Sequence, residues 1–188
     1  MPVILQYGCA IRHSITVDCL LSFKIPLYRK RSKYMQEKVA EDIIVQRDSF
    51  PHLDAVLKLN RLVFGEKRLI NRLDHDPLIF LTAHCKGRLA GFKIGYALNR
   101  RVFYSAKGAT APGFRRRGIA TRLMDAMMDD AALLGFTELQ YDTFPALYPG
   151  MIVVGFRYGF HIKSMEWNRD FDDFRVRLAR SLQGQRFR

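Results

Sequence analysis

Hydrophobic and polar positions along the middle of the chain form runs of the length and composition typical of β-strands. Three such runs occupy residues 78–85, 89–98 and 102–111. Lys86-Gly87 and Asn99-Arg100 separate them, and turns this short predict an antiparallel meander of three strands. Glycines inside these runs indicate bulges, or places where a ligand or another backbone comes close. These glycines are Gly91, Gly95 and Gly108.

Other patterns before and after the meander predict helices and further strands. Apolar spacing of three and four residues predicts a helix over residues 48–64 and an amphipathic helix over residues 119–134. The remaining expected elements are a strand at 43–47, a short amphipathic piece at 66–73, a strand at 136–143, a short helix or irregular turn at 145–158, a strand at 159–167 and a charged helix at 170–183.

Residues 1–38 differ from the rest of the chain. Apolar stretches broken by charges precede a basic cluster, and neither the order nor the flanks are those of a signal peptide. We expect a poorly ordered basic extension here. An amphipathic membrane-surface or transit-like segment stays open, as does a true start at Met35. Residues 39–188 show no linker and are expected to form one domain.

The net charge of the chain says more about its partners than its overall composition does. The 188 residues include 31 Lys and Arg against 18 Asp and Glu, which gives a formal charge of +13. Such a balance predicts anionic partners such as nucleotide phosphates, although a solvated basic surface explains it as well. A nucleic-acid-binding protein is less well supported, because no recognition helix or basic stripe with interleaved aromatics is visible. Three widely spaced cysteines form neither a disulfide framework nor a zinc pattern, so a reducing, cytoplasmic setting and no metal are expected.

The strongest chemical signal is the basic turn at residues 112–121, Pro-Gly-Phe-Arg-Arg-Arg-Gly-Ile-Ala-Thr. It joins a predicted strand to the start of a predicted helix, where backbone N–H groups lack helical acceptors. Gly118 lets a ligand approach the backbone, and three arginines add to the positive end of the helix dipole. This combination is suited to binding a pyrophosphate.

The string Arg115-Arg116-Arg117-Gly118-Ile119-Ala120 resembles the Arg/Gln-x-x-Gly-x-Gly/Ala signature of the GNAT acyltransferase superfamily. The order of elements over residues 43–167 is similar to that family's order as well, and so is Gly159-Phe160 after the predicted short helix. The resemblance implies an α+β fold with a mixed, mostly antiparallel sheet flanked by helices. It also implies that this sheet is splayed open between the strand ending at Ala111 and the strand at 136–143, with acyl-CoA in the opening.

The resemblance also implies a function: acetyl transfer from acetyl-CoA to an amine by direct attack. The turn would bind the pyrophosphate through its N–H groups, and the strand before it would pair with the pantetheine amides. The residues implied in acetyl-CoA binding are Ala109, Thr110, Arg115, Arg116, Arg117, Gly118, Ile119, Ala120 and Thr121.

The catalytic groups are less clearly marked. The family often has a tyrosine acid four residues before the closing Gly-Phe, and this chain has Gly155 there. We expect Tyr148 to act as the acid in its place, with Tyr158 as the alternative. A catalytically silent acyl-CoA-binding module with a regulatory role is the competing hypothesis, and Gly155 is its best support.

Glu66 is the expected general base, because it lies where the substrate-side segments should face the opening. Asp142 and His84 are the alternatives. Neither the acceptor nor the length of the acyl group can be read from the residues. The basic surface favours a neutral or acidic acceptor, a small molecule or a peptide, and a homodimer stays open.

Overall fold

The computed structural model of the chain describes residues 43–47 and 50–183. The expected basic extension at residues 1–38 and the alternative start at Met35 lie outside the described residues.

One seven-stranded sheet runs through the described part of the chain, with the strand order β1-β2-β3-β4-β5-β7-β6. Its strands are β1 (Ile43–Gln46), β2 (Leu78–Cys85), β3 (Arg88–Ala97), β4 (Val102–Thr110), β5 (Glu138–Thr143), β6 (His161–Asn168) and β7 (Asp173–Ser181). Neighbouring strands are antiparallel except for β4 and β5, which are parallel. The expected meander of β2, β3 and β4 and the mostly antiparallel α+β fold are therefore confirmed.

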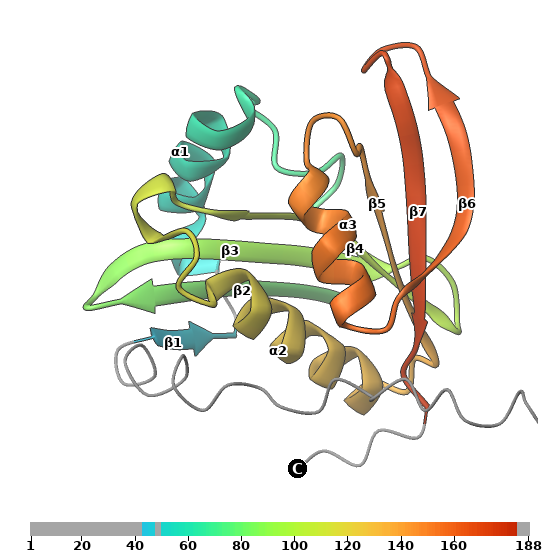
Figure 1. The fold of residues 1–188 in the computed structure, drawn as a ribbon. Coiled ribbons are helices and arrows are strands. Elements are labelled where there is room, and N and C mark those ends of the chain that lie inside the picture. The colour runs from blue at the N-terminus through green and yellow to red at the C-terminus, as the bar shows by residue number, and fades with distance from the viewer. Residues whose placement is uncertain (1–42, 48–49, 184–188) are drawn as a thin grey trace, which may run out of the picture.

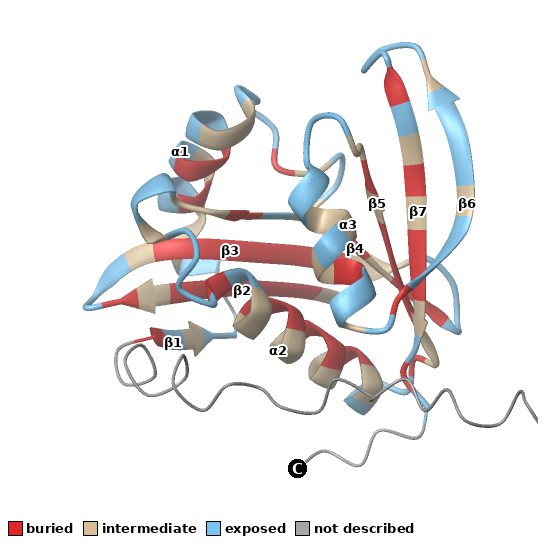
Figure 2. Cartoon of the chain, in the orientation of Figure 1, coloured by how far each residue is buried: buried red, intermediate tan, exposed pale blue. Residues whose placement is uncertain are grey.

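Helices cover both faces of the sheet (Figure 1). They are α1 (Leu53–Phe64), α2 (Ile119–Leu133) and α3 (Pro149–Arg157), with 3-10 turns at Phe50–His52 and Pro112–Phe114. The buried side of α2 packs on one face and contributes Leu123, Met124 and Met127 to the larger core cluster. A smaller cluster around Val56 and Phe92 joins α1 to the opposite face. Figure 2 shows this burial along β3, β7 and the inner side of α2, whereas β6 is mostly exposed.

Two glycines of β3 are required by the close approach of β4. A Cβ atom at Gly95 would lie 2.6 Å from the Tyr104 carbonyl oxygen, and one at Gly91 would lie 2.8 Å from that of Ala109. The register also shifts between Ile94 and Gly95, which is a β-bulge. The prediction that these glycines mark bulges or close approach is confirmed.

The sheet opens between β4 and β5. The two strands pair only where Val102, Phe103 and Tyr104 lie opposite Glu138, Leu139 and Gln140. Beyond this point the β1–β4 half and the β5–β7–β6 half diverge, and α3 lies over the gap between them (Figure 1). The splay expected between the strand ending at Ala111 and the strand at 136–143 is confirmed.

Two expected elements are wrong. The C-terminal helix expected at residues 170–183 is the strand β7, in which apolar residues at 174, 176 and 178 alternate with Arg175 and Arg177. This two-residue period outweighs the helical spacing of Phe171, Phe174 and Leu178. The amphipathic piece expected at 66–73 is an irregular loop, anchored by Asn60, whose amide donates to the carbonyl oxygens of Glu66 and Arg68.

Candidate active site

A cleft of about 630 Å³ occupies the opening of the sheet. Its walls come from β3, β4, β5, α2 and α3, from the end of α1 and from the loop after β5. Residues at one end belong to the basic turn and α2, and residues at the other end belong to α1 and its following loop. The cleft therefore runs through the sheet and joins the faces that α1 and α2 cover.

The basic turn forms the first end of this cleft through Arg115 and Ala120. Gly118, at the N-cap of α2, has a φ of 77°, and Arg116 also has a positive φ, of 61°. No side chain of the described residues caps α2, and its first N–H group with a backbone acceptor is that of Arg122, bonded to the Gly118 carbonyl at 3.0 Å. Among the described residues, the N–H groups of the preceding three residues, 119–121, have no backbone acceptor. Free donors and positive charge coincide here, as an anion site requires.

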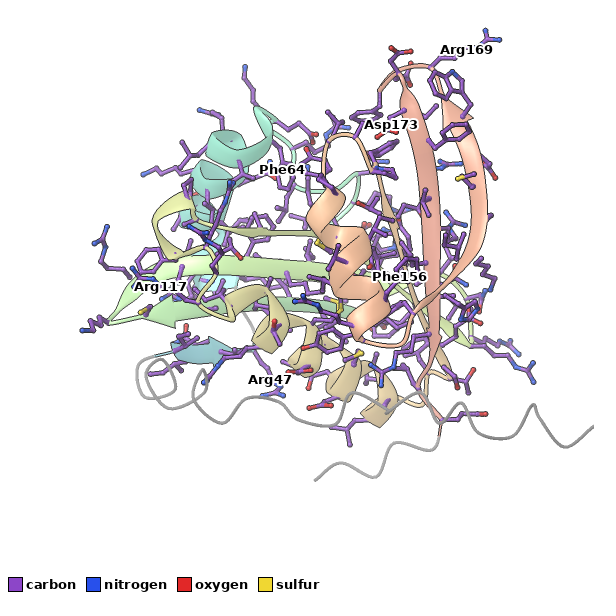
Figure 3. All side chains as sticks on the ribbon, viewed as in Figure 1. Arg47, Phe64, Arg117, Phe156, Arg169 and Asp173 are labelled. Carbon is purple, nitrogen blue, oxygen red and sulfur yellow. The ribbon has the colours of Figure 1, made fainter. Side chains whose placement is uncertain are left out.

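The Phe114 ring contacts one arginine of this turn and one arginine of β3. The guanidinium carbon of Arg117 lies 5.5 Å from the centre of the Phe114 ring, and that of Arg88 lies 5.6 Å from it. In Figure 3, Arg117 extends from the turn before α2, and Phe64 lies on the end of α1. Cation–π contacts of this kind hold the arginines without neutralising them.

The main chain of β4 forms the floor of the cleft. Ala109 and Thr110 pair with Phe92 and Gly91 of β3 on one side. Their other side faces the opening, because β5 pairs with β4 only as far as Tyr104. Ala106 is the extra residue of the bulge and has no register partner in β3. An extended ligand can therefore add to the free side of β4 as a strand would.

The second end of the cleft combines one ion pair with two aromatic rings. Lys107 Nζ donates to a Glu66 carboxylate oxygen at 2.5 Å and lies 4.9 Å from the centre of the Phe64 ring. The ring of Tyr148 packs edge-on against Phe64 at 5.9 Å. Burial, and then the nearby Glu66 carboxylate, raise the pKa of Tyr148. The two expected catalytic residues, Glu66 and Tyr148, thus lie near each other in the cleft.

Asp142 lines the same end, but both of its oxygens are engaged. Arg177 donates to them from Nε and from one terminal nitrogen at 2.7 and 2.8 Å. These hydrogen bonds raise the pKa of Arg177. Burial, followed by the Asp142 charge, raises the pKa of Tyr104. Asp142 is therefore fixed in an ion pair with Arg177 and is not a free base.

Tyr141 fills the space beside Gly155. A Cβ atom at residue 155 would lie 2.2 Å from the Tyr141 hydroxyl oxygen and 2.9 Å from a methyl carbon of Leu178. That hydroxyl donates to the Met151 carbonyl at 2.8 Å, and burial raises the pKa of Tyr141 to about 12. Gly155 is therefore explained by packing: the Tyr141 ring from β5 needs the room that a side chain on α3 would take.

The other expected residues lie outside the lining of the cleft. His84 contacts the Thr82 hydroxyl at 3.1 Å and the His52 ring at 4.7 Å. Tyr158 donates its hydroxyl to the Thr121 carbonyl at 3.2 Å. The members of the basic turn that do not line the cleft are Arg116, Arg117, Gly118, Ile119 and Thr121. The side chain of Ile119 is in the core, so only its backbone can serve a ligand.

Two polar residues stand out among the cleft residues that were not expected from the sequence. Tyr141 is one, and Lys93, a buried lysine in the middle of β3, is the other. The signal for Lys93 was present in the sequence, because it is the one charge inside the otherwise apolar run of residues 89–97. In the described part of the chain, no group of three or more His, Cys, Asp or Glu residues is arranged to hold a metal ion. Nor does any helix there have the length and apolar character to cross a membrane.

Comparisons with known structures agree with this fold. Ard1 from Thermoplasma volcanium shares 18% identity with a TM-score of 0.65, over 74% of this chain and 97% of that one. A GNAT family acetyltransferase from Elizabethkingia anophelis, solved with acetyl-CoA bound, shares 17% identity with a TM-score of 0.63, over 75% and 99%. The ribosomal-protein-S18-alanine N-acetyltransferase from Escherichia coli shares 13% identity with a TM-score of 0.66, over 77% and 99%.

At these identities the structural likeness shows the fold alone, and family membership depends on the sequence. No curated protein matches the chain significantly. The sequence model of the acetyltransferase (GNAT) family, however, matches residues 43–149, which is more than half of the chain. That stretch includes β1 through the start of α3, and with it the basic turn and the splay. The chain therefore belongs to the acetyltransferase (GNAT) family.

Proposed function

We propose that the protein is an N-acetyltransferase that moves an acetyl group from acetyl-CoA directly to an amine. The observation that carries this proposal is that one cleft contains both the basic N-terminus of α2 and the unpaired edge of β4. A pyrophosphate and a peptide-like pantetheine chain need these two features in this order. The family match supports acyl-CoA as the donor.

The donor would lie along β4. N–H groups of the turn at residues 115–120 would bind the pyrophosphate, and Arg115 would add charge from the wall of the cleft. Main-chain groups of Ala109 and Thr110 would pair with the pantetheine amides. The thioester would then reach the bulge at Ala106, where backbone freed from the ladder can donate to the carbonyl oxygen.

The acceptor would enter at the end formed by Glu66, Phe64 and Tyr148. We assign the general base to Glu66, whose carboxylate is half exposed, with 53% of its side chain accessible. It would take a proton from the attacking ammonium directly or through water. Tyr148, beside it, would contact the acceptor. Lys107 and the overall charge favour a neutral or acidic acceptor over a polycation.

The donor site is tested by Gly118→Asp with Gly87→Asp as its matched control. Both glycines have a similar positive φ, 77° and 74°, and neither has an atom within 4 Å of an added Cβ. Backbone strain is thus equal, and only position 118 places a carboxylate against the phosphates. We expect CoA affinity to fall at least about 30-fold in Gly118→Asp, or about 2 kcal/mol, and to stay within about twofold in Gly87→Asp. Equal affinity in both variants would refute the site.

Catalysis is tested separately from binding. Free thiol released from acetyl-CoA is measured with a panel of amines: amino acids, polyamines, peptides and aminoglycosides. Stimulation by at least one amine, lost in Glu66→Gln, is the expected result. Thermal stabilisation by CoA without thiol release from any amine would favour a silent acyl-CoA-binding module instead.

A further inference from the structure

Lys93 is a buried cation in the wall of the cleft. It lies in the middle of β3, its residue is 7% exposed, and it lines the opening between β4 and β5. Within the part of the chain that the structure describes, its ammonium has no hydrogen-bond or salt-bridge partner. A charge buried in this way costs several kcal/mol unless something compensates it.

The neighbouring strand leaves room for this side chain. Lys93 lies opposite Gly108 of β4 in the register, and a Cβ atom at Gly108 would be 3.4 Å from Lys93 Cγ. The lysine stem therefore passes the one residue of β4 that has no side chain there. The direction from Lys93 across Gly108 leads to the opening of the sheet on the far side of β4. It meets the opening between residues 109–110, which would pair with pantetheine, and the bulge at Ala106.

Among the described residues, 43–47 and 50–183, no carboxylate is available to pair with Lys93. The two carboxylates of the cleft are taken, Glu66 by Lys107 and Asp142 by Arg177. Burial alone lowers the pKa of Lys93 to about 8, with no neighbouring charge contributing. Within the described structure only a bound ligand can supply a compensating negative charge, and the anion formed where the thioester of an acyl-CoA breaks is the leaving thiolate.

We infer that the Lys93 ammonium contacts the sulfur of CoA and protonates it as the thioester breaks. This inference rests on the proposed function. The amine nitrogen attacks the thioester carbon, the C–S bond breaks, and the sulfur keeps the electron pair. One proton moves from Lys93 to the sulfur, which leaves free CoA thiol and a neutral lysine. The proton lost by the amine goes to Glu66, and solvent returns a proton to Lys93 before the next turnover.

The tyrosines of the cleft are less suited to this step. The Tyr141 hydroxyl is already donated to the Met151 carbonyl at 2.8 Å. Tyr148 packs on Phe64 beside Glu66, at the acceptor end. The pKa of Lys93, by contrast, is close to that of a thiol, about 8.5, and proton transfer between matched groups has a low barrier.

The first test needs no acceptor. The thiol of bound CoA is titrated by its thiolate absorbance, with the desulfo-CoA complex subtracted, in the wild type, Lys93→Met and Tyr148→Phe. In the wild type and Tyr148→Phe we expect a thiol pKa at least about 1 unit below its free value, because a cation within a few ångströms favours the thiolate. In Lys93→Met the shift should vanish. Equal titration in the wild type and Lys93→Met would overturn the inference.

The second test separates a catalytic from a structural lysine. Met has nearly the shape of Lys but carries no charge. If Lys93 serves only ligand chemistry, its replacement by Met should therefore stabilise the unliganded protein. Lys93→Met should raise the melting temperature of the unliganded protein by a few degrees. It should also reduce kcat at least about 100-fold with little change in the KM for acetyl-CoA. A lower melting temperature, or unchanged kcat, would overturn the inference.

The two proposals fail in different ways. If CoA does not bind the wild type, the proposed function itself is wrong. If CoA binds and Gly118→Asp weakens it, but Lys93→Met titrates like the wild type, only the role of Lys93 is wrong. If Tyr148→Phe loses both turnover and the thiol shift while Lys93→Met keeps both, the acid is Tyr148 and the role of Lys93 is overturned.

Discussion

Gly155→Ala places a methyl group where the Tyr141 hydroxyl now lies. The new Cβ atom would be 2.2 Å from that oxygen and 2.9 Å from Leu178, so the ring of Tyr141 must shift. Overpacking of a well-packed site costs about 1–3 kcal/mol, and loss of the hydrogen bond to the Met151 carbonyl costs about 1 kcal/mol more. Alanine regains about 1 kcal/mol of helix propensity. The free energy of unfolding should therefore fall by about 2 kcal/mol.

Removing the Tyr141 hydroxyl should remove most of the loss of stability that Gly155→Ala causes. Tyr141→Phe alone loses the hydrogen bond, about 1 kcal/mol. In the Tyr141→Phe background the nearest remaining ring carbon is 3.4 Å away, and the Leu178 methyl can move. Gly155→Ala should then cost less than about 0.5 kcal/mol, which gives a coupling energy of about 2 kcal/mol between the two positions.

Urea denaturation of the four proteins of this cycle measures the coupling. Gly150→Ala is the matched control, because it lies in the same helix and no atom is within 4 Å of an added Cβ. It should be neutral or slightly stabilising. If Gly155→Ala is as harmless as Gly150→Ala, or if its cost is the same with and without the Tyr141 hydroxyl, then Tyr141 does not explain the glycine.

Further predictions concern the charges of the cleft. Because the pKa of Lys93 is about 8 in the fold and about 10.4 when unfolded, the unfolded chain binds more protons between these values. The stability of the wild type should therefore rise relative to Lys93→Met between pH 8 and 10.4, by up to about 3 kcal/mol in denaturation curves, and a constant difference would contradict the burial argument. Arg177→Met leaves the nearly buried Asp142 with only the more distant Arg175, whose Nε is 3.9 Å from the carboxylate, and should lower the free energy of unfolding by about 2–3 kcal/mol. Asp142→Asn in the same protein should recover part of this loss, and no recovery would show that the loss comes from packing.

The sequence predicted the part of the fold in which local and tertiary signals agree. Short polar turns at Lys86-Gly87 and Asn99-Arg100 define the meander, and the apolar spacing of residues 119–134 defines α2. The C-terminal strand was mispredicted because Phe171, Phe174 and Leu178 fit a helical face by chance. The alternation of apolar residues with Arg175 and Arg177 was the better signal, and pairing with β5 fixes it.

The candidate site was predictable where it depends on backbone geometry. The basic turn and its glycine need only a strand, a turn and a helix, all of which the sequence shows. Tyr141 and Lys93 could not be placed, because their importance depends on which residue lies opposite them in the fold. Gly155 and Gly108 make room for them, and only the packing of α3 and the β3–β4 register bring these pairs together.

The proposed function requires the cleft to bind acetyl-CoA through the turn at residues 115–120 and to pass its acetyl group to an amine. The most direct measurement follows free thiol released from acetyl-CoA with the amine panel, in the wild type, Gly118→Asp and Gly87→Asp. We expect amine-dependent release in the wild type and Gly87→Asp and, at acetyl-CoA concentrations below KM, at least about a 30-fold lower rate in Gly118→Asp. Absence of amine-dependent release from the wild type, or equal rates in the two aspartate variants, would refute the proposed function.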